Sequence, residues 1–541
     1  MKTQRKPCRF LLPSSAAFTV LLFVTSFGIL YAQVPAGPNR PAGVPDGYMI
    51  TPSGYSHPSC LIELAKGDIL LEDGRGIQHA DGGIKKINPC AYPNYTTSGR
   101  IIVAGSGTEE PPELSGDQWV EDANLTTNTS YGGIKATWIV PPAPLSNDGQ
   151  TVLLFPALSG ALTIIQPVLG WNAGSAAPQW SIASWNCCYN GNKVYSAHLN
   201  VNSGDTIQGT IQSVCSAGTL SCSGWNITTL DVTSGQSSEL TSTSSYGQTF
   251  NVADSGVLEV YNVVQCSDYS PNGGVSFSDV ALYDYNFNEI SNPNWGTGID
   301  VVGMTPQCAY GVQVAPTQVK LFAGAPEALT VNVSGNGTVT SSPAGIWSCP
   351  GSTCSFVGIS CPGTCSATFS QGTPVTLSAS PASGYKFTGW SGACAGTGTC
   401  TVEMAAAESV TAIFALPTFS ISPISTSMPL SLGHTRNYTF NVSALNEFTG
   451  TVALSAGGLP TGVTGSFSPS SINLTSANAF GTTTLTLTAA YSNSTYTGGS
   501  TGQTGAQTGV TVTGTSVSST DSIVFDLNTR PLQYRGYCGV Q

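Results

Sequence analysis

Short runs of alternating apolar and polar residues recur along most of the chain. Between residues 117 and 316, Gly, Asn, Ser and Pro separate such runs, which begin near residues 134, 151, 163, 179, 206, 224, 257 and 275. A period of two residues predicts strands with one buried face, and the separating residues are typical of turns. The region lacks the period of an amphipathic helix. Many short strands of this kind predict a β-sandwich.

Changes in this pattern divide the chain into modules of an all-β protein. We expect a concanavalin-like jelly-roll β-sandwich at 117–316, followed by two small β domains at 317–415 and 418–515 and a polar tail at 516–541. Residues 33–116 begin with a Pro- and Gly-rich stretch and contain few strand-like runs. We interpret this segment as an N-terminal appendage or prosegment.

The N-terminus has the pattern of a secretory signal peptide at 1–32. Four basic residues precede an apolar run over 16–30, and Leu-Tyr-Ala at 30–32 is a plausible cleavage site. The apolar run is shorter than the roughly 20 residues that span a bilayer. We therefore expect cleavage, no membrane span in the mature chain, and an extracellular, secreted protein.

Composition agrees with export. Charged residues make up only 9% of the chain, and 17 basic residues face 29 acidic ones, which argues against a nucleic-acid partner. In an exported chain, 16 Cys favour disulfides. Cys187 and Cys188 are interpreted as disulfide partners. Disulfides are also favoured over zinc, which remains the alternative, for the close pairs Cys349 and Cys354, Cys361 and Cys365, and Cys394 and Cys400.

The charge of the main module points to an acidic habitat. Residues 117–300 contain 14 acidic and two basic residues, a net charge of −12. Such a module repels itself at neutral pH and less so in acid. Few of its carboxylates can have ion-pair partners to lose on protonation, so acid should destabilise the module less than usual.

Elimination leaves carboxylate and amide chemistry. The main module has one histidine, His198, which excludes a His-rich metal site, and the Gly-x-Ser-x-Gly elbow of many serine hydrolases is absent. We expect neither a cofactor nor a metal. Asp268 and Asn272 lie in a turn that could hold calcium, but their spacing matches no EF-hand loop.

An ordered series of motifs between about 120 and 290 resembles the glutamic peptidases, or eqolisins. The series consists of Lys-Ala-Thr-Trp-Ile-Val-Pro-Pro from 135, Ile-Ile-Gln-Pro-Val-Leu-Gly-Trp from 164, Gln-Trp-Ser-Ile-Ala-Ser-Trp-Asn from 179, Val-Asn-Ser-Gly-Asp-Thr-Ile from 201, Leu-Asp-Val-Thr-Ser-Gly-Gln from 230, Val-Leu-Glu-Val-Tyr-Asn-Val from 257 and Ser-Phe-Ser-Asp-Val from 276. The resemblance implies an acid-acting endopeptidase with a polypeptide substrate and a catalytic dyad of Gln166 and Glu259. The chain departs from the family at 155–160, where Phe-Pro-Ala-Leu-Ser-Gly stands for Trp-x-Gly-Ile-Asp-Gly.

Elementary chemistry supports the same two residues. One carboxyl group can serve as base and then as acid, and a rigidly held amide can donate to the oxyanion. Glu259 shares a strand face with Val257 and Tyr261, and Gln166 lies in a similarly apolar strand. Partial burial there would raise the pKa of the glutamic acid. We expect Trp180 and Tyr261 to contact substrate.

Two other functions remain open. The middle module resembles internalin-type B repeats and the last one resembles the immunoglobulin-like domains of secreted bacterial proteins, so both are candidates for cell-surface or glycan attachment. The main module is then either the peptidase or a carbohydrate- or surface-binding jelly roll without catalysis. A glycosidase is a weaker alternative that needs a second carboxylate beside Glu259, for which Asp279 is the candidate.

Overall fold

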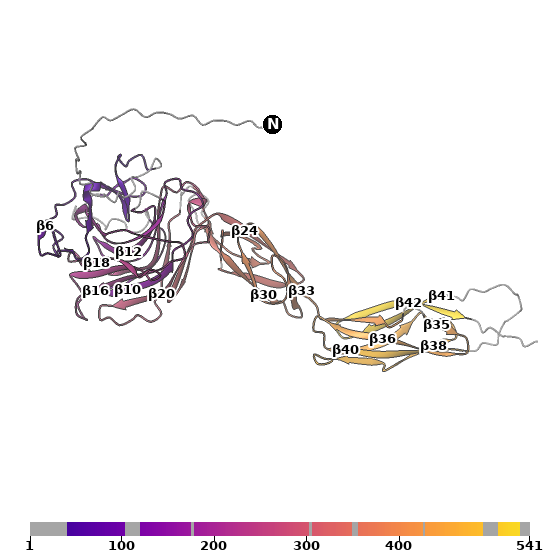
Figure 1. The fold of residues 1–541 in the computed structure, drawn as a ribbon. Coiled ribbons are helices and arrows are strands. Elements are labelled where there is room, and N and C mark those ends of the chain that lie inside the picture. Colours follow the sequence, from indigo (N-terminus) through magenta and orange to yellow (C-terminus); the bar gives the residue numbers. More distant parts are fainter. Residues whose placement is uncertain are drawn as a thin grey trace, which may run out of the picture.

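The computed structural model describes residues 40–530, apart from 103–118, 175–177, 302–305, 344, 349–354, 426–427 and 491–506. The predicted signal peptide, the Cys349 and Cys354 pair and the end of the predicted tail lie outside the described residues. The described part is built of strands joined by turns and three short 3-10 helices, η1 (Pro58–Cys60), η2 (Tyr189–Gly191) and η3 (Cys266–Asp268). The all-β prediction is confirmed. Figure 1 shows three bodies in chain order, of which the first is the largest.

The first body is a sandwich of two mainly antiparallel sheets. Its seven-stranded sheet has the spatial order β18 (Gln236–Ser244), β17 (Gly224–Asp231), β16 (Thr206–Ser213), β10 (Tyr131–Ile139), β20 (Val275–Asp284), β23 (Gln318–Phe322) and β22 (Gly311–Ala315). Its nine-stranded sheet has the order β21 (Gly296–Ile299), β9 (Trp119–Thr126), β19 (Val252–Tyr261), β11 (Thr151–Ser159), β12 (Ile164–Trp171), β13 (Trp180–Cys187), β14 (Lys193–Ser196) and β3 (Leu61–Leu64), while β15 (Leu199–Val201) pairs with β13.

The main core fills the space between these two sheets. It includes Trp138 and Phe277 from the seven-stranded sheet and Ile165, Leu169 and Leu258 from the nine-stranded sheet, all at most 3% exposed. Strand alternation sends every second side chain of these strands into the core. The sandwich extends beyond the expected boundary at residue 316, because β23 joins its seven-stranded sheet.

The other face of the nine-stranded sheet is also apolar, and the N-terminal appendage covers it. We call this face the covered face. Its cluster includes Phe155, Val168 and Trp185 from the sheet and Tyr48 and Tyr55 from the appendage. The nine-stranded sheet is therefore buried on both sides.

The appendage consists of small sheets and one strand that joins the sandwich. Strands β1 (Met49–Thr51), β2 (Gly54–Ser56), β7 (Asn94–Tyr95) and β8 (Ile101–Ile102) form one sheet, and β4 (Ile69–Leu70), β5 (Gly76–Gln78) and β6 (Ile84–Lys86) form another. Strand β3 pairs in parallel with β14 at the edge of the nine-stranded sheet. A disulfide links Cys60 to Cys90 within the appendage. The appendage is thus integrated into the sandwich rather than separate from it.

The two C-terminal bodies are smaller two-sheet modules. The middle one has sheets β29 (Ser366–Ser370), β24 (Pro326–Ser334), β33 (Glu408–Ala415), β31 (Lys386–Gly392) and β28 (Ser360–Cys361), β25 (Gly337–Ser342), β30 (Pro374–Pro381), β32 (Cys400–Glu403), with a hairpin of β26 (Ile346–Ser348) and β27 (Ser355–Val357). The last has sheets β34 (Thr418–Pro423), β36 (Thr435–Leu445), β40 (Phe480–Ala489), β38 (Val463–Ser468) and β35 (Met428–Ser431), β42 (Thr520–Arg530), β41 (Gln507–Thr515), β37 (Gly450–Gly457), β39 (Ser471–Leu474). Residues 520–530 of the expected polar tail are therefore a strand of this module.

Disulfides occur in both the sandwich and the middle module. Besides the bond in the appendage, the bonded pairs are Cys187 with Cys188, Cys215 with Cys222, Cys266 with Cys308, Cys361 with Cys365, and Cys394 with Cys400. The predicted disulfides at 187–188, 361–365 and 394–400 are confirmed. In the part of the chain that the structure describes, no helix has the length and apolar character needed to cross a membrane.

Candidate functional site

Gln166 lies on the covered face, in the middle of the nine-stranded sheet. It pairs in register with Trp185 of β13, whose side chain belongs to the apolar cluster of that face. The Gln166 side chain is fully buried, and neither its amide nitrogen nor its amide oxygen has a hydrogen-bond partner among the described residues. An amide left in this state costs about 1–3 kcal/mol. It is available for a ligand that displaces whatever covers it.

Glu259 lies on the same face, two strands away on β19. Its Oε1 atom accepts a hydrogen bond from the backbone N–H of Ser53 at 2.7 Å and another from the hydroxyl of Tyr261, while Oε2 has no partner among the described residues. Burial raises the pKa of Glu259 to about 7, against the opposing effects of these two hydrogen bonds and of the Lys193 charge. The rise has the direction expected from the sequence, but the side chain is fully and not partly buried.

The strand register offsets Gln166 from Glu259 along the sheet. Glu259 pairs with Leu153 of β11, which pairs with Gly170 of β12. Gly170 is four positions from Gln166, or about 13 Å along a strand. The two predicted residues therefore share a face without lying opposite each other in the ladder.

The register places another carboxyl group, that of Asp254, across from Gln166. Leu158 pairs with Ile165, which brings Ala157 beside Gln166, and Ala157 pairs with Asp254 of β19. Paired residues point to the same side of a sheet. Asp254 therefore joins Gln166 on the covered face, with only the small side chain of Ala157 between them. No motif of the sequence pointed to Asp254.

Asp254 resembles Glu259 in its environment. It is buried, and its Oδ2 atom has no hydrogen-bond partner among the described residues. Burial raises its pKa well above the ordinary value, the nearby charge of Asp122 raises it further, and the nearby Ser159 hydroxyl opposes the rise. The covered face thus holds two buried acids, each with one unpaired oxygen.

Lys193 is a buried cation at the edge of the same face. Its Nζ atom donates to Thr51 Oγ1 at 2.7 Å, to the carbonyl of Pro52 at 2.9 Å and to the carbonyl of Ser53 at 3.0 Å. Burial lowers its pKa to about 7, although the charge of Glu259 opposes that shift. The three acceptors all belong to the tip of the β1–β2 hairpin. No local pattern in the sequence indicates this contact, because it joins residues about 140 positions apart.

The two aromatic residues expected to contact substrate lie on opposite faces. The Tyr261 hydroxyl accepts from the backbone N–H of Gly54 at 2.5 Å and lies 2.9 Å from the carbonyl of Thr51, so it belongs to the site around Glu259. Trp180 packs in the main core, with its ring centroid 5.4 Å from that of Trp171. Trp180 does not share the covered face.

The other candidate residues lie elsewhere. Asp279 is exposed on β20 of the seven-stranded sheet, so it is not brought to Glu259. The Asp268 carboxylate accepts from the backbone N–H groups of Val264 and Gln265, at 2.8 and 3.1 Å. Within the described ranges, no three His, Cys, Asp or Glu side chains are grouped so as to hold a metal ion.

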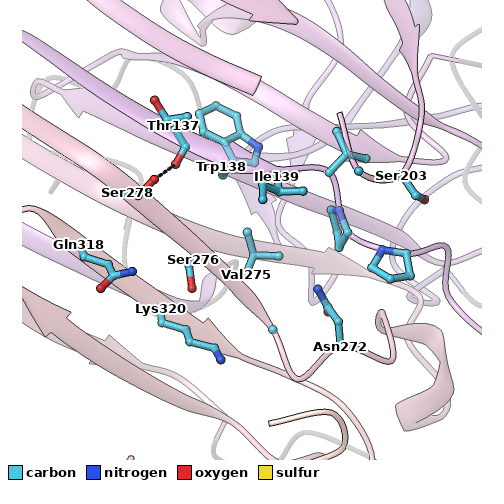
Figure 2. A pocket seen from close by; sticks show the side chains of 15 residues that line it. Thr137, Trp138, Ile139, Ser203, Asn272, Val275, Ser276, Ser278, Gln318 and Lys320 are labelled. Atoms are coloured by element: carbon cyan, nitrogen blue, oxygen red, sulfur yellow. Dashed lines mark hydrogen bonds between the residues drawn. The ribbon is translucent and has the colours of Figure 1, made fainter. Parts of the chain in front are cut away.

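An open pocket of about 640 Å³ lies on the outward face of the seven-stranded sheet. Figure 2 shows Thr137, Ser276, Ser278 and Lys320 along it, with the Ser278 hydroxyl donating to the carbonyl of Thr137. None of the predicted catalytic or substrate-contacting residues lines this pocket. It is distinct from the covered face.

Comparisons with known proteins match single modules. Residues 358–417 match the family described as Divergent InlB B-repeat domain, which confirms the resemblance of the middle module to such repeats. No curated protein matches the chain. The immunoglobulin-like character of the last module stays a prediction.

Similarity to solved structures is weak. A crystal structure of Scytalido-glutamic peptidase with a peptide-based transition state analog is 17% identical, with a TM-score of 0.28, and covers 38% of this chain and 98% of its own. SCP-B, a member of the Eqolisin family of peptidases in complex with the tripeptide Ala-Ile-His, is 18% identical with a TM-score of 0.27 and the same coverage. Domains 4 and 5 of the S-layer protein SbsC are 12% identical with a TM-score of 0.15, over 47% of this chain and 90% of theirs.

Proposed function

We propose that the chain is a secreted, acid-acting endopeptidase whose active site is the covered face. In this proposal Gln166 acts with one of the two buried acids of that face, either Glu259, which the sequence predicts, or Asp254, which the register places opposite Gln166. Tyr261 contacts the substrate, and the substrate is a polypeptide. One observation carries the proposal: a fully buried amide with two unpaired polar atoms shares an apolar sheet face with buried carboxyl groups that each have an unpaired oxygen. The ordered motifs of the sequence support the same reading.

The cost of this arrangement is the reason to assign it a function. Leaving a buried polar group unpaired costs about 1–3 kcal/mol, and an apolar residue in β12 would avoid that cost. The unpaired amide nitrogen of Gln166 is suited to donate to the oxyanion of a tetrahedral intermediate. The unpaired oxygens of Gln166 and the acids can position water.

The proposed chemistry needs one carboxyl group in two protonation states. As a carboxylate, the acid that acts with Gln166 takes a proton from the water that attacks the peptide carbon, while the Gln166 amide donates to the developing oxyanion. As an acid, it then gives that proton to the leaving amine. Burial under the appendage holds Glu259 in its acid form below about pH 7. Exposure to water would reduce the burial effect and return its pKa toward the acidic range.

Asp254 is a second candidate for this carboxyl group. It lies opposite Gln166 across Ala157, whereas Glu259 is displaced along the strand. Either acid can act as base and then as acid, so the reaction class is the same. Separate variants of the two residues decide which one acts.

The proposed location is extracellular. Disulfides in the sandwich and the middle module fit an oxidising compartment. The two C-terminal modules would attach the enzyme to a cell surface or a glycan. Export itself rests on the predicted signal peptide at 1–32, outside the described residues.

The test is digestion of a denatured protein at pH 3.5. A specific protease site placed between residues 105 and 112 nicks the chain, so that the appendage can leave the covered face. We expect cleavage by the nicked wild type and a loss of about 10²–10³-fold in Gln166→Ala, the usual effect of removing an oxyanion donor. A loss of cleavage in Glu259→Gln or in Asp254→Asn identifies the acting carboxyl group. The control variant is Glu289→Gln, which changes an exposed acid of the same sandwich.

Two outcomes would refute the proposal. One is that the nicked wild type is still folded but does not cleave the denatured protein. The other is full cleavage by Gln166→Ala and by both acid variants.

Glycoside hydrolysis is the second candidate, because Asp122 pairs with Val257 of β19 and so brings a further carboxyl group to the covered face that holds Asp254. A pair of carboxyl groups is what that reaction requires. Release of reducing sugar from oligosaccharides by the nicked chain, with no protein cleavage and with loss in Asp122→Asn, would replace the peptidase proposal.

A further inference from the structure

We propose that the hairpin of β1 and β2, residues 49–56, is an intramolecular plug that occupies the substrate position on the covered face and keeps the site closed. The statement that the plug inhibits an enzyme rests on the proposed function. The statement that it fills a peptide-binding groove does not.

The hairpin tip binds the site through its backbone. The N–H of Ser53 donates to Glu259 Oε1 at 2.7 Å, and the N–H of Gly54 donates to the Tyr261 hydroxyl at 2.5 Å. Every peptide offers such N–H groups, so the same face can hold a segment of another polypeptide. The occupant we infer for the open groove is therefore an extended or turning peptide segment.

Lys193 anchors the tip through its carbonyls. The Pro52 and Ser53 carbonyls and the Thr51 hydroxyl all accept from its ammonium group. A buried ammonium needs acceptors for its three N–H bonds, and the tip supplies three. The tip therefore supplies every acceptor that the Lys193 ammonium group needs. These three hydrogen bonds fix the position of the tip on the covered face.

These contacts also explain why the plug is a poor substrate. The tip presents one N–H group to Glu259 and one to Tyr261, and its carbonyls at positions 52 and 53 accept from Lys193. The Gln166 amide stays without a partner. No tip carbonyl is therefore held by Gln166, so the proposed oxyanion donor does not act on the peptide bonds of the tip.

The backbone of the tip is specialised for this close fit. Ser53 has φ of 64° and Gly54 has φ of 113°. A Cβ atom at Gly54 would meet the carbonyl oxygen of Tyr95 at 2.1 Å, which is backbone and cannot move aside. Gly47 also has a positive φ, 83°, but a Cβ atom there meets nothing within 4 Å. Gly54→Ala therefore adds both a clash and backbone strain, whereas Gly47→Ala adds backbone strain alone.

The experiment compares Gly54→Ala with Gly47→Ala in the full chain. The probe is a fluorescent synthetic peptide with the sequence of residues 47–58. We expect binding to Gly54→Ala at least tenfold tighter than to wild type or Gly47→Ala, together with faster amide hydrogen exchange over 49–56. Lys193→Met, which removes the anchor, is the second variant should Gly54→Ala not fold.

The outcomes separate the plug from the proposed activity. Tight peptide binding by the opened variant without any cleavage, even in the nicked chain, supports the plug and removes the peptidase. If the variants whose hairpins exchange faster bind the peptide no more tightly than wild type does, the plug is overturned. Full cleavage of a protein substrate by un-nicked wild type, with the hairpin still protected from exchange, also overturns the plug and leaves the peptidase standing.

Discussion

Glu259 and Lys193 are buried ionisable residues, and both form hydrogen bonds with the tip of the β1–β2 hairpin. Burial raises the pKa of the first and lowers that of the second, to about 7 in both cases. Each charge opposes the shift of the other. Both side chains are therefore sensitive to removal of the hairpin, which would change their exposure and their hydrogen-bond partners together.

The pH dependence of stability tests the burial of Glu259. Its folded pKa is raised from 4.5 to about 7, so its favourable contribution is complete below pH 4.5 and is lost as pH rises through 7. Glu259→Gln cannot titrate. We expect its free energy of unfolding, relative to wild type, to improve by on the order of 3 kcal/mol between pH 4.5 and 8.

Denaturant unfolding at both pH values, followed by tryptophan fluorescence, measures this difference. Glu289→Gln, which changes an exposed acid in the same sandwich, should show a much smaller one. A difference for Glu259→Gln no larger than that of Glu289→Gln would mean that Glu259 is exposed to solvent.

At the scale of elements, the appendage keeps the hairpin in place. Strand β3 adds to the edge of the nine-stranded sheet beside β14, and the side chains of Tyr48, Ile50 and Tyr55 pack on the covered face. The Cys60–Cys90 disulfide closes a loop with a sequence separation of 30 that contains β3. The hairpin is thus presented by a folded element rather than by a free tail.

Removal of this disulfide should loosen the hairpin. We expect Cys60→Ser with Cys90→Ser to lower the free energy of unfolding of the appendage by about 3–4 kcal/mol, the loop-entropy value for a loop of this length. Hydrogen exchange over 49–56 should accelerate. Cys394→Ser with Cys400→Ser, in the middle module, should leave exchange in the hairpin unchanged. Equal effects of the two double variants on that exchange would argue against the clamp.

At the scale of the whole molecule, the sandwich buries several acids with raised pKa values. Burial is the largest cause of the raised pKa of Glu121, Asp122, Asp254 and Glu259. Groups with a raised folded pKa stabilise the fold at low pH and lose that contribution as pH rises. His198 and Lys193 act in the opposite direction, because burial lowers their pKa values, to about 4 and about 7. Four acids outweigh these two bases.

The sandwich should therefore be most stable in mild acid. We expect its unfolding temperature to be higher near pH 4.5 than near pH 7, by several degrees, while the last module, in which none of the described acids is buried, changes less. Differential scanning calorimetry of the full chain at the two pH values resolves the transitions. A sandwich transition that is highest at neutral pH would contradict the burial of these acids.

Much of this organisation follows from local pattern. Alternation and turn residues predict the all-β class because both depend on neighbours in sequence. The same alternation correctly assigned Glu259 to the face of Val257 and Tyr261. The close cysteine pairs were predictable because each cysteine has its partner within a few residues in the sequence.

Tertiary structure alone decided which polar groups meet. A register shift in β19 between Asp254 and Gly256 puts Asp254 on the same face as Glu259, although an odd separation of five residues assigns them to opposite faces by alternation. The hairpin contacts of Glu259 and Lys193 join residues more than 100 positions apart. Periodicity specifies the face of a strand, whereas register, bulges and long-range packing specify the partner, and these depend on the energy of the assembled fold.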